Sequence, residues 1–193
     1  WREGAYANLA WPALLRSSDL NESDRRFAAE LAYGTLRHTG QLNSILREAS
    51  GKNPQSWQPG VLWVMQLGVY QLMHMRTATH AAVNETVTMA RTVGVGRASG
   101  LVNAVLRKVA GRTLEEWLRH LCLAGESEQD CLSSAYAHPV WIIDELQKSL
   151  AREGRGAEIE AVLHSHNTPA RVTAALLPGV CEADDGEERT PYS

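Results

Sequence analysis

The sequence predicts an all-α protein with one main helical domain, and three observations lead to this fold class. Residues 61–75 are apolar almost all the way round, broken only by Gln66, Gln71, His74 and the small Gly68. Apolar residues recur at three- and four-residue spacing in the segments on both sides of this run. The chain of 193 residues is 44% hydrophobic but contains a single Phe, and this composition favours helices over a β-sandwich.

Residues 61–75 are expected to form a central buried helix. A helix that is apolar on every face is normally buried, and this run is shorter than the roughly 20 residues of a membrane span. A strand is the alternative, but strands rarely exceed about 10 residues, and Pro59-Gly60 is a usual helix-entry signal. Gly68 would let a neighbouring helix approach closely. Leu67 is expected to belong to the core, so that Leu67→Ala would cost about 2–5 kcal/mol.

Helices are also expected before this central one. Residues 5–15 read as a short helix that Pro12 would kink or restart. A cluster of N-cap residues around Ser23 precedes a periodic region that extends to about residue 49, with Gly40 as a bend or break. Residues 50–54 have the composition of a loop.

Two amphipathic helices are expected after the central one, over residues 80–93 and 100–111. Each has an apolar and a polar face: Val83, Val87 and Ala90 against Asn84, Thr88 and Arg91 in the first, and Val102, Val105, Leu106 and Val109 against Asn103 and Arg107 in the second. Residues 5–111 are therefore expected to form a helical bundle with short connections.

The second part of the chain is expected to contain further helices and one strand. Thr113 would cap a helix whose first turn is acidic, and residues 134–139 are interpreted as a break. Pro139 would lie in the first turn of the next helix. Residues 171–176 carry the one convincing strand signal, and residues 181–193 form an acidic tail that is expected to be disordered.

The charge is distributed unevenly along the chain. Residues 1–113 hold 13 Lys and Arg against 7 Asp and Glu, a net charge of +6, whereas residues 114–193 hold 6 against 15, a net charge of −9. A basic domain followed by an acidic segment indicates that the first part meets a polyanion. The positive net charge of the first part is explained equally well if its basic side chains only solvate the helix faces.

The cysteines and the start of the chain bear on the compartment. Cys122, Cys131 and Cys181 show neither C-x-x-C spacing nor a paired His spacing, so neither a disulfide framework nor a zinc site is expected. Three reduced thiols fit a cytoplasmic protein. No signal peptide is visible and no membrane association is expected. Because the chain begins at Trp1, it is interpreted as a fragment of a longer protein.

Three stretches together resemble the NusB-like helical domain: LAYGTLRHTGQLN (31–43), LGVYQLMHM with HAAVNETVTMAR (67–91), and GLVNAVLRKV (100–109). The resemblance implies an RNA-binding fold. Free-standing members of this family are transcription antitermination factors, and the same domain forms the N-terminus of the RsmB/Sun/Fmu family of rRNA (cytosine-C5)-methyltransferases. Residues 3–15, 135–146 and 166–176 resemble the methyltransferase branch, the last two its linker helix and its entry strand.

This resemblance implies a domain plan and a function. Residues 1–112 would be the NusB-like RNA-binding domain, and residues 113–180 the linker helices and first strand of the methyltransferase N-terminal subdomain. The implied function is RNA binding and substrate positioning in an rRNA cytosine-C5 methyltransferase. Ribosomal RNA and a C-terminal methyltransferase domain missing from this chain are the expected partners. A free-standing antitermination factor and a helical protein-interaction domain are the alternatives.

The catalytic module of the methyltransferase family is not expected in this chain. Such enzymes bind S-adenosylmethionine on a Gly-rich turn after a strand and attack cytosine through a Cys next to Pro. Here Gly94 and Gly96 lie between two expected helices, and no Cys precedes a Pro. No catalytic, cofactor-binding or metal-binding residue is assigned, S-adenosylmethionine is expected only for the full-length parent, and the fragment alone is expected to be inactive.

Basic residues of the first domain are the candidates for RNA contact, because Arg and Lys bind phosphates and Arg stacks on unpaired bases. The candidates are Arg37, Arg107, Lys108, Arg112, Arg25, Arg26, Arg76 and Arg47. The first four are expected near one end of the bundle, with Arg37 the strongest single candidate. Arg25 and Arg26 could instead pair with the nearby Asp19 and Asp24.

Other residues in the family-like stretches are interpreted as structural. His80, Asn84 and Asn103 are expected to bond backbone carbonyls or loop ends, as buried polar groups usually do. Tyr33 and Tyr70 are expected to pack in or beside the core rather than to stack on bases.

Overall fold

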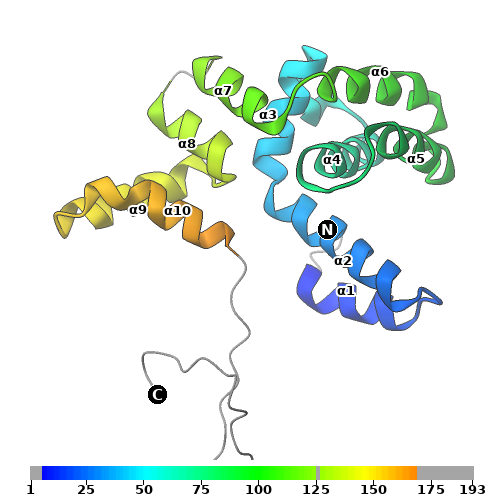
Figure 1. Ribbon diagram of the computed structural model, residues 1–193, viewed down its shortest axis with the longest axis horizontal. Coiled ribbons are helices and arrows are strands. Elements are labelled where there is room, and N and C mark those ends of the chain that lie inside the picture. The colour runs from blue at the N-terminus through cyan, green and yellow to red at the C-terminus, as the bar shows by residue number, and fades with distance from the viewer. Residues whose placement is uncertain (1–5, 125–126, 169–193) are drawn as a thin grey trace, which may run out of the picture.

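The computed structural model describes residues 6–124 and 127–168, and every regular element in these ranges is helical, which confirms the all-α prediction (Figure 1). The predicted strand at 171–176 and the acidic tail at 181–193 lie outside the described residues. The α-helices are α1 (Ala7–Arg16), α2 (Glu22–Arg37), α3 (Thr39–Ser50), α4 (Pro59–His74), α5 (Thr79–Thr92), α6 (Ser99–Val109), α7 (Leu114–Ala124), α8 (Glu128–Tyr136), α9 (Val140–Arg152) and α10 (Ile159–Asn167). Short 3-10 turns, η1 (Pro54–Ser56), η2 (Gly96–Ala98) and η3 (Gly156–Glu158), precede α4, α6 and α10.

The central helix is confirmed as α4, which begins at Pro59 and packs against α2, α3, α5 and α6. Met65 and Val69 are fully buried in the core that these helices share. The prediction that α4 is buried on every face is wrong, however. Trp63 keeps 46% of its surface exposed, and Leu67, one turn further on the same face, is half-buried and outside the core. The neighbouring helices leave this face uncovered, so Leu67 is a poor probe of the core.

Two glycines allow close approach between helices of the bundle. A Cβ atom on Gly68 would lie 2.8 Å from Thr86 Cγ2 and 2.9 Å from Leu106 Cδ1, closer than such contacts occur. The absent side chain thus lets α4 contact both α5 and α6, as predicted. At Gly34 in α2, a Cβ atom would overlap the ring of Tyr70.

The helices before α4 largely follow the sequence signals. Asn21 caps α2 by accepting a hydrogen bond from the backbone N–H of Asp24 at 2.9 Å. The break between α2 and α3 falls at His38, two residues before the expected Gly40. Pro12 neither ends nor restarts α1, which continues through it as one helix.

Helices α7 to α10 extend the structure beyond the bundle (Figure 1). Thr113 caps α7 as predicted, because its Oγ1 accepts from the N–H of Glu116 while its own N–H donates to the Glu116 carboxylate at 2.7 Å. Residues 134–136, interpreted as part of a break, form the last turn of α8. That helix ends where Ala137 adopts a left-handed conformation, with φ of 56°. Five buried residues form a second, smaller core here: Leu132, Ile143, Leu150, Ile159 and Leu163, flanked by Tyr136, Leu146 and Val162.

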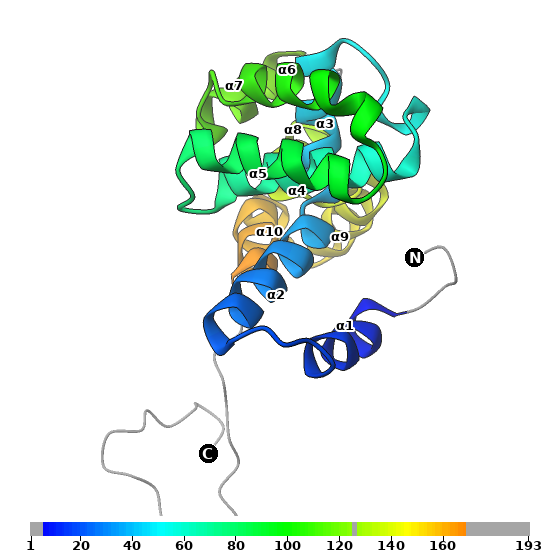
Figure 2. The same cartoon turned by 90° about the vertical axis from the view of Figure 1, so that its right-hand side faces the viewer.

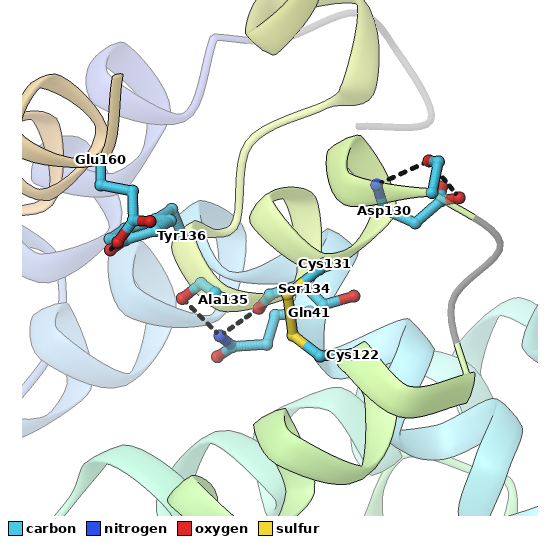
Figure 3. Close-up of a disulfide and its surroundings, with 9 residues drawn as sticks. Gln41, Cys122, Asp130, Cys131, Ser134, Ala135, Tyr136 and Glu160 are labelled. Carbon is cyan, nitrogen blue, oxygen red and sulfur yellow. Dashed lines mark hydrogen bonds between the residues drawn. A yellow bond between two sulfur atoms is a disulfide. The ribbon is translucent and has the colours of Figure 1, made fainter. Parts of the chain in front are cut away.

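The expectation of three reduced thiols is wrong for two of them, because Cys122 and Cys131 form a disulfide (Figure 3). Cys122 lies near the end of α7 and Cys131 near the start of α8, and these two helices pack against each other so that the two Cα atoms are 4.4 Å apart. The nine-residue separation matches no short redox or metal motif, so spacing alone could not find the pair. Cys181 lies outside the described residues.

Polar side chains from α2, α3 and α4 meet and reach α8. His74 Nε2 lies 2.8 Å from Gln41 Oε1, and the buried Gln41 Nε2 donates to the backbone carbonyl of Ser134 at 2.7 Å (Figure 3). On its other side His74 stacks on Tyr70, with ring centroids 5.0 Å apart, and the Tyr70 hydroxyl donates to Glu30 at 2.6 Å. This network attaches the end of α8 to the bundle.

Acid is expected to destabilise the protein through His74. Burial lowers the pKa of His74 to about 4, and His38, whose ring centroid is 4.3 Å away, adds to the lowering. Glu30 and Arg37 are the other charged groups in this region. The unfolded chain binds a proton at His74 near pH 6.5, so the stability contributed by neutral His74 is present above that pH and is lost as the pH falls towards 4.

The measurement is the free energy of unfolding in urea at pH 7 and pH 4.5, for wild type and His74→Gln. We expect the variant to lose about 1–2 kcal/mol less than wild type over this interval, a value reduced for partial exposure. The exposed His164 supplies the control, and His164→Gln should follow the wild-type pH dependence. Equal losses for wild type and His74→Gln would contradict the prediction.

Among the described residues, no helix is long and apolar enough to cross a membrane.

Candidate nucleic-acid interface

The two polar helix faces predicted from the sequence border the same surface groove in the structure. α5 and α6 pack side by side at one edge of the bundle (Figure 2), and a groove runs between their outer faces. Two adjoining hollows, of about 490 and about 580 Å³, make up this α5–α6 groove. Asn84 of α5 and Arg107 of α6 line both hollows, so the two side chains stand at the point where the hollows meet.

The walls of the first hollow are mainly apolar, and those of the second are about equally polar and apolar. The first hollow is lined by Thr79, His80, Val83 and Asn84 of α5, together with Arg107 and the adjoining Ala110 and Gly111. The second is lined by Asn84, Val87, Thr88 and Arg91 of α5, and by Ser99, Gly100, Asn103 and Arg107 of α6.

Positive charge and neutral polar groups line the α5–α6 groove, and no carboxylate is among its lining residues. Arg91 and Arg107 provide two permanent cations, and His80 adds an imidazole. Amides and hydroxyls supply hydrogen-bond donors and acceptors beside these charges. A concave surface of this composition suits an anion that also carries hydrogen-bonding groups.

The guanidinium group of Arg107 is oriented by a single hydrogen bond through Nε. Its Nε donates to Asn103 Oδ1, four residues earlier on the same helix face, at 3.0 Å. In the part of the chain that the structure describes, Arg107 makes no ion pair, in contrast to Arg119 and Arg155, which pair with glutamates. The two terminal nitrogens of an arginine held in this way can bind a phosphate in fork geometry.

The predicted basic residues do not gather at one end of the bundle. Lys108 and Arg112 lie near Glu48, close to the end of α3, where they help His120 to lower the pKa of that carboxylate. Arg37 ends α2 at the opposite end of α3, about 14 Å away along the helix axis at 1.5 Å per residue. The expectation of one shared end is therefore wrong for Arg37, because α3 separates it from the others.

The other candidates have varied surroundings. Arg112 lies over the Trp117 ring, 4.7 Å from its centroid, which restrains it as a cation–π pair. Arg26 pairs with Glu22 rather than with the predicted aspartates, and half-buried Arg25 donates to the Ser18 carbonyl at 3.0 Å. Arg76 is exposed in the connection before α5. Arg47 is exposed in α3. A role in RNA contact stays a prediction for all eight.

Among the described hydrogen bonds, none joins His80, Asn84 or Asn103 through its side chain to a backbone carbonyl or a loop end, so the structural interpretation of these residues stays a prediction. The three side chains line the α5–α6 groove, and the one hydrogen bond described among them joins Asn103 to Arg107 rather than to the backbone. Arg91 was not a candidate, although its place on the polar face with Asn84 was a usable signal. Tyr70, in contrast, is buried beside the core as expected.

Comparison with known proteins identifies a matching family and several related proteins. The NusB family matches residues 2–111. A protein of Mycobacterium tuberculosis that carries the name "Putative methyltransferase" is 38% identical over 184 residues, which cover 94% of this chain and 39% of that protein. Ribosomal RNA small subunit methyltransferase B of Escherichia coli is 31% identical over 130 residues, which cover 67% of this chain and 28% of that protein. The chain thus spans well under half the length of both relatives.

The resemblance drawn from the sequence motifs is confirmed by this match and by the helical fold. The match to the family covers the bundle α1 to α6, including both helices of the α5–α6 groove. On these grounds the chain belongs to the NusB family.

Proposed function

We propose that this chain is the RNA-binding, substrate-positioning part of an S-adenosylmethionine-dependent rRNA cytosine-C5 methyltransferase that acts in the cytoplasm. The observation that carries the proposal is the α5–α6 groove, which combines Arg91 and Arg107 with amide groups and has no lining carboxylate. Nucleic acids present phosphates and base edges together, and this groove offers partners for both. The net charge of +6 over residues 1–113 supports the same ligand class.

The relatives favour a methyltransferase over a free-standing antitermination factor. Similarity to the Mycobacterium tuberculosis protein extends over 94% of the chain, and so continues past residue 111 into α7 to α10. A factor consisting of the bundle alone would give no reason for likeness in these helices. In the proposal, α7 to α10 connect the RNA-binding bundle to a methyltransferase domain.

S-adenosylmethionine enters this proposal only through the enzyme class. The described residues are helical and contain no Gly-rich turn between a strand and a helix, the usual cradle for such a cofactor. The described residues therefore do not fit S-adenosylmethionine, and the proposal gives this chain no step that involves the cofactor. The contribution of this chain is to bind RNA and hold it in place.

A salt titration tests RNA binding. The whole chain is titrated against a labelled fragment of small-subunit rRNA between 50 and 300 mM salt (about a sixfold range), and the slope of log K against log salt is measured. Phosphate contacts release counterions, so the slope should be about −0.7 for each phosphate neutralised on a single strand. Replacing Arg107 and Lys108 together by Ala should flatten the slope by roughly one to two phosphate equivalents.

The matched control removes two cations that already have acidic partners. Arg119 pairs with Glu115 at 2.8 Å and Lys148 with Glu145 at 2.7 Å, and all four side chains are exposed. The double variant Arg119→Ala, Lys148→Ala should keep the wild-type slope. Two outcomes would contradict the proposal that the chain binds RNA through its phosphates. In the first, wild type does not bind at about 50 mM salt; in the second, it binds with an affinity that does not depend on salt.

A further inference from the structure

We propose that Cys122 and Cys131 form a reversible redox switch, which a dithiol reductant opens and which sets how firmly α8 is held to α7. The regulatory meaning of the switch rests on the cytoplasmic function proposed above, because disulfides of cytoplasmic proteins are usually transient and either catalytic or redox-sensing. Its chemistry does not depend on RNA binding, since neither cysteine lines the α5–α6 groove.

The disulfide connects the two hydrophobic cores of the structure. Cys122 directly follows Leu121, which packs against the main core, and Cys131 directly precedes Leu132, which belongs to the second core. The backbone between α7 and α8 is the other covalent connection between these two helices. Opening the disulfide therefore removes a direct connection between the bundle and the second core.

Contacts without sulfur hold both helices against α3. On α7, His120 Nε2 lies 2.9 Å from Glu48 Oε1. On α8, the carbonyls of Ser134 and Ala135 accept hydrogen bonds from Gln41 Nε2 at 2.7 and 3.3 Å (Figure 3). Because α3 carries both Glu48 and Gln41, reduction would leave the two thiols near each other. The pair can then close again, as a reversible switch requires.

The disulfide lies where a reductant can approach it. Both cysteines are half-buried, and neither belongs to the buried residues of the two cores. Leu123, which follows Cys122, has 83% of its surface exposed, and Ser127 and Glu128 in the segment before Cys131 are exposed as well. The rate of thiol–disulfide exchange depends on access to the sulfur atoms. This disulfide is therefore better placed for exchange than one enclosed in a core.

Opening takes two exchange steps. A thiolate of the reductant attacks one sulfur atom, forms a mixed disulfide with it and releases the other cysteine. The second thiol of the reductant then attacks the mixed disulfide and releases the first cysteine. Two electrons and two protons thus pass to the protein, and the reductant becomes a disulfide. Oxidised glutathione closes the pair by the reverse exchange, and leaves as two molecules of reduced glutathione.

Amide hydrogen exchange of the whole chain, followed by mass spectrometry, tests the switch. Cys181→Ser removes the third cysteine, so that only the pair can react. The chain is measured in oxidised glutathione, in reduced dithiothreitol and again in oxidised glutathione, and free thiols are detected by alkylation and intact mass. We expect both thiols to be free only in dithiothreitol. Exchange in residues 118–124 and 128–134 should then be faster by about tenfold, because the disulfide no longer limits local opening.

The matched control is the double variant Cys122→Ser, Cys131→Ser in the same background. It lacks the disulfide under all conditions, so it should show the exchange of the reduced chain and should not respond to dithiothreitol. Exchange in α4 should be the same in all samples, because its residues belong to the main core. Circular dichroism shows whether the reduced chain and the variant keep the helical fold.

Three results would overturn the switch. Free thiols in oxidised glutathione would mean that the pair does not form. A disulfide that stays closed in excess dithiothreitol, or a chain that unfolds when it opens, would mean that the bond is structural only. Unchanged exchange in α7 and α8 after opening would mean that it does not hold these helices together. None of these results bears on the salt titration of RNA binding, and loss of RNA binding beside a working redox cycle would overturn the proposed function alone.

Discussion

Replacing Trp117 by alanine is expected to lower the free energy of unfolding by about 3–5 kcal/mol, the largest single-residue effect that we predict. Trp117 is the largest fully buried side chain among the residues that the structure describes, with 1% of its surface exposed. Its indole N–H donates to the backbone carbonyl of Val109 at 2.9 Å. Alanine would leave a cavity at the end of α6 and remove one of the two hydrogen bonds to the Val109 carbonyl, which also accepts from the N–H of Arg112 at 3.3 Å.

Urea unfolding followed by circular dichroism measures this effect, and Trp141→Ala is its control. Trp141 has the same side chain but is 68% exposed at the start of α9. Its replacement should change the free energy of unfolding by less than about 0.5 kcal/mol. If the two variants were equally stable, Trp117 would not anchor α7 to the bundle.

Replacing Met65 by alanine is expected to cost about 2–5 kcal/mol, the second largest effect. Met65 lies in the middle of α4 and is fully buried in the main core. Four helices pack against α4 on its buried side, so the side chains next to Met65 have little freedom to collapse into the space left by the thioether.

The same helix supplies the control for Met65. Leu67 lies two residues away on the half-buried face beside the exposed Trp63. Leu67→Ala should cost clearly less than Met65→Ala, because part of its side chain already contacts water. Thermal and urea unfolding of both variants check the order. A larger loss for Leu67→Ala would mean that another element covers this face in solution.

The sequence predicted the helices of the bundle well because their signals are local. Pro59-Gly60 marked the start of α4, the polar and apolar faces of α5 and α6 followed helical spacing, and Thr113 marked α7. Which side of α4 is buried was not predictable in this way. An all-apolar helix carries no periodic signal, and the neighbours that leave Trp63 and Leu67 uncovered are set by tertiary packing.

The candidate site was predicted in its parts but not in its assembly. The polar faces with Asn84 and Asn103 could be read from each helix alone, whereas their meeting across one groove depends on how α5 packs against α6. The prediction that Arg37 lies near Arg107 was wrong for the same reason, because the sequence alone does not show that α3 separates the two residues. The Cys122–Cys131 pair likewise depends on how α7 packs against α8.

The fit of Tyr70 over Gly34 has a consequence for the evolution of this bundle. Any side chain at position 34 would overlap the Tyr70 ring, and Tyr70 is itself held by its hydrogen bond to Glu30. Positions 34 and 70 should therefore change together among descendants of this sequence: a larger residue at 34 becomes tolerable only after the aromatic ring at 70 has been lost. The order of the two substitutions matters, because one of the two intermediate sequences carries an overpacked core and the other only a cavity.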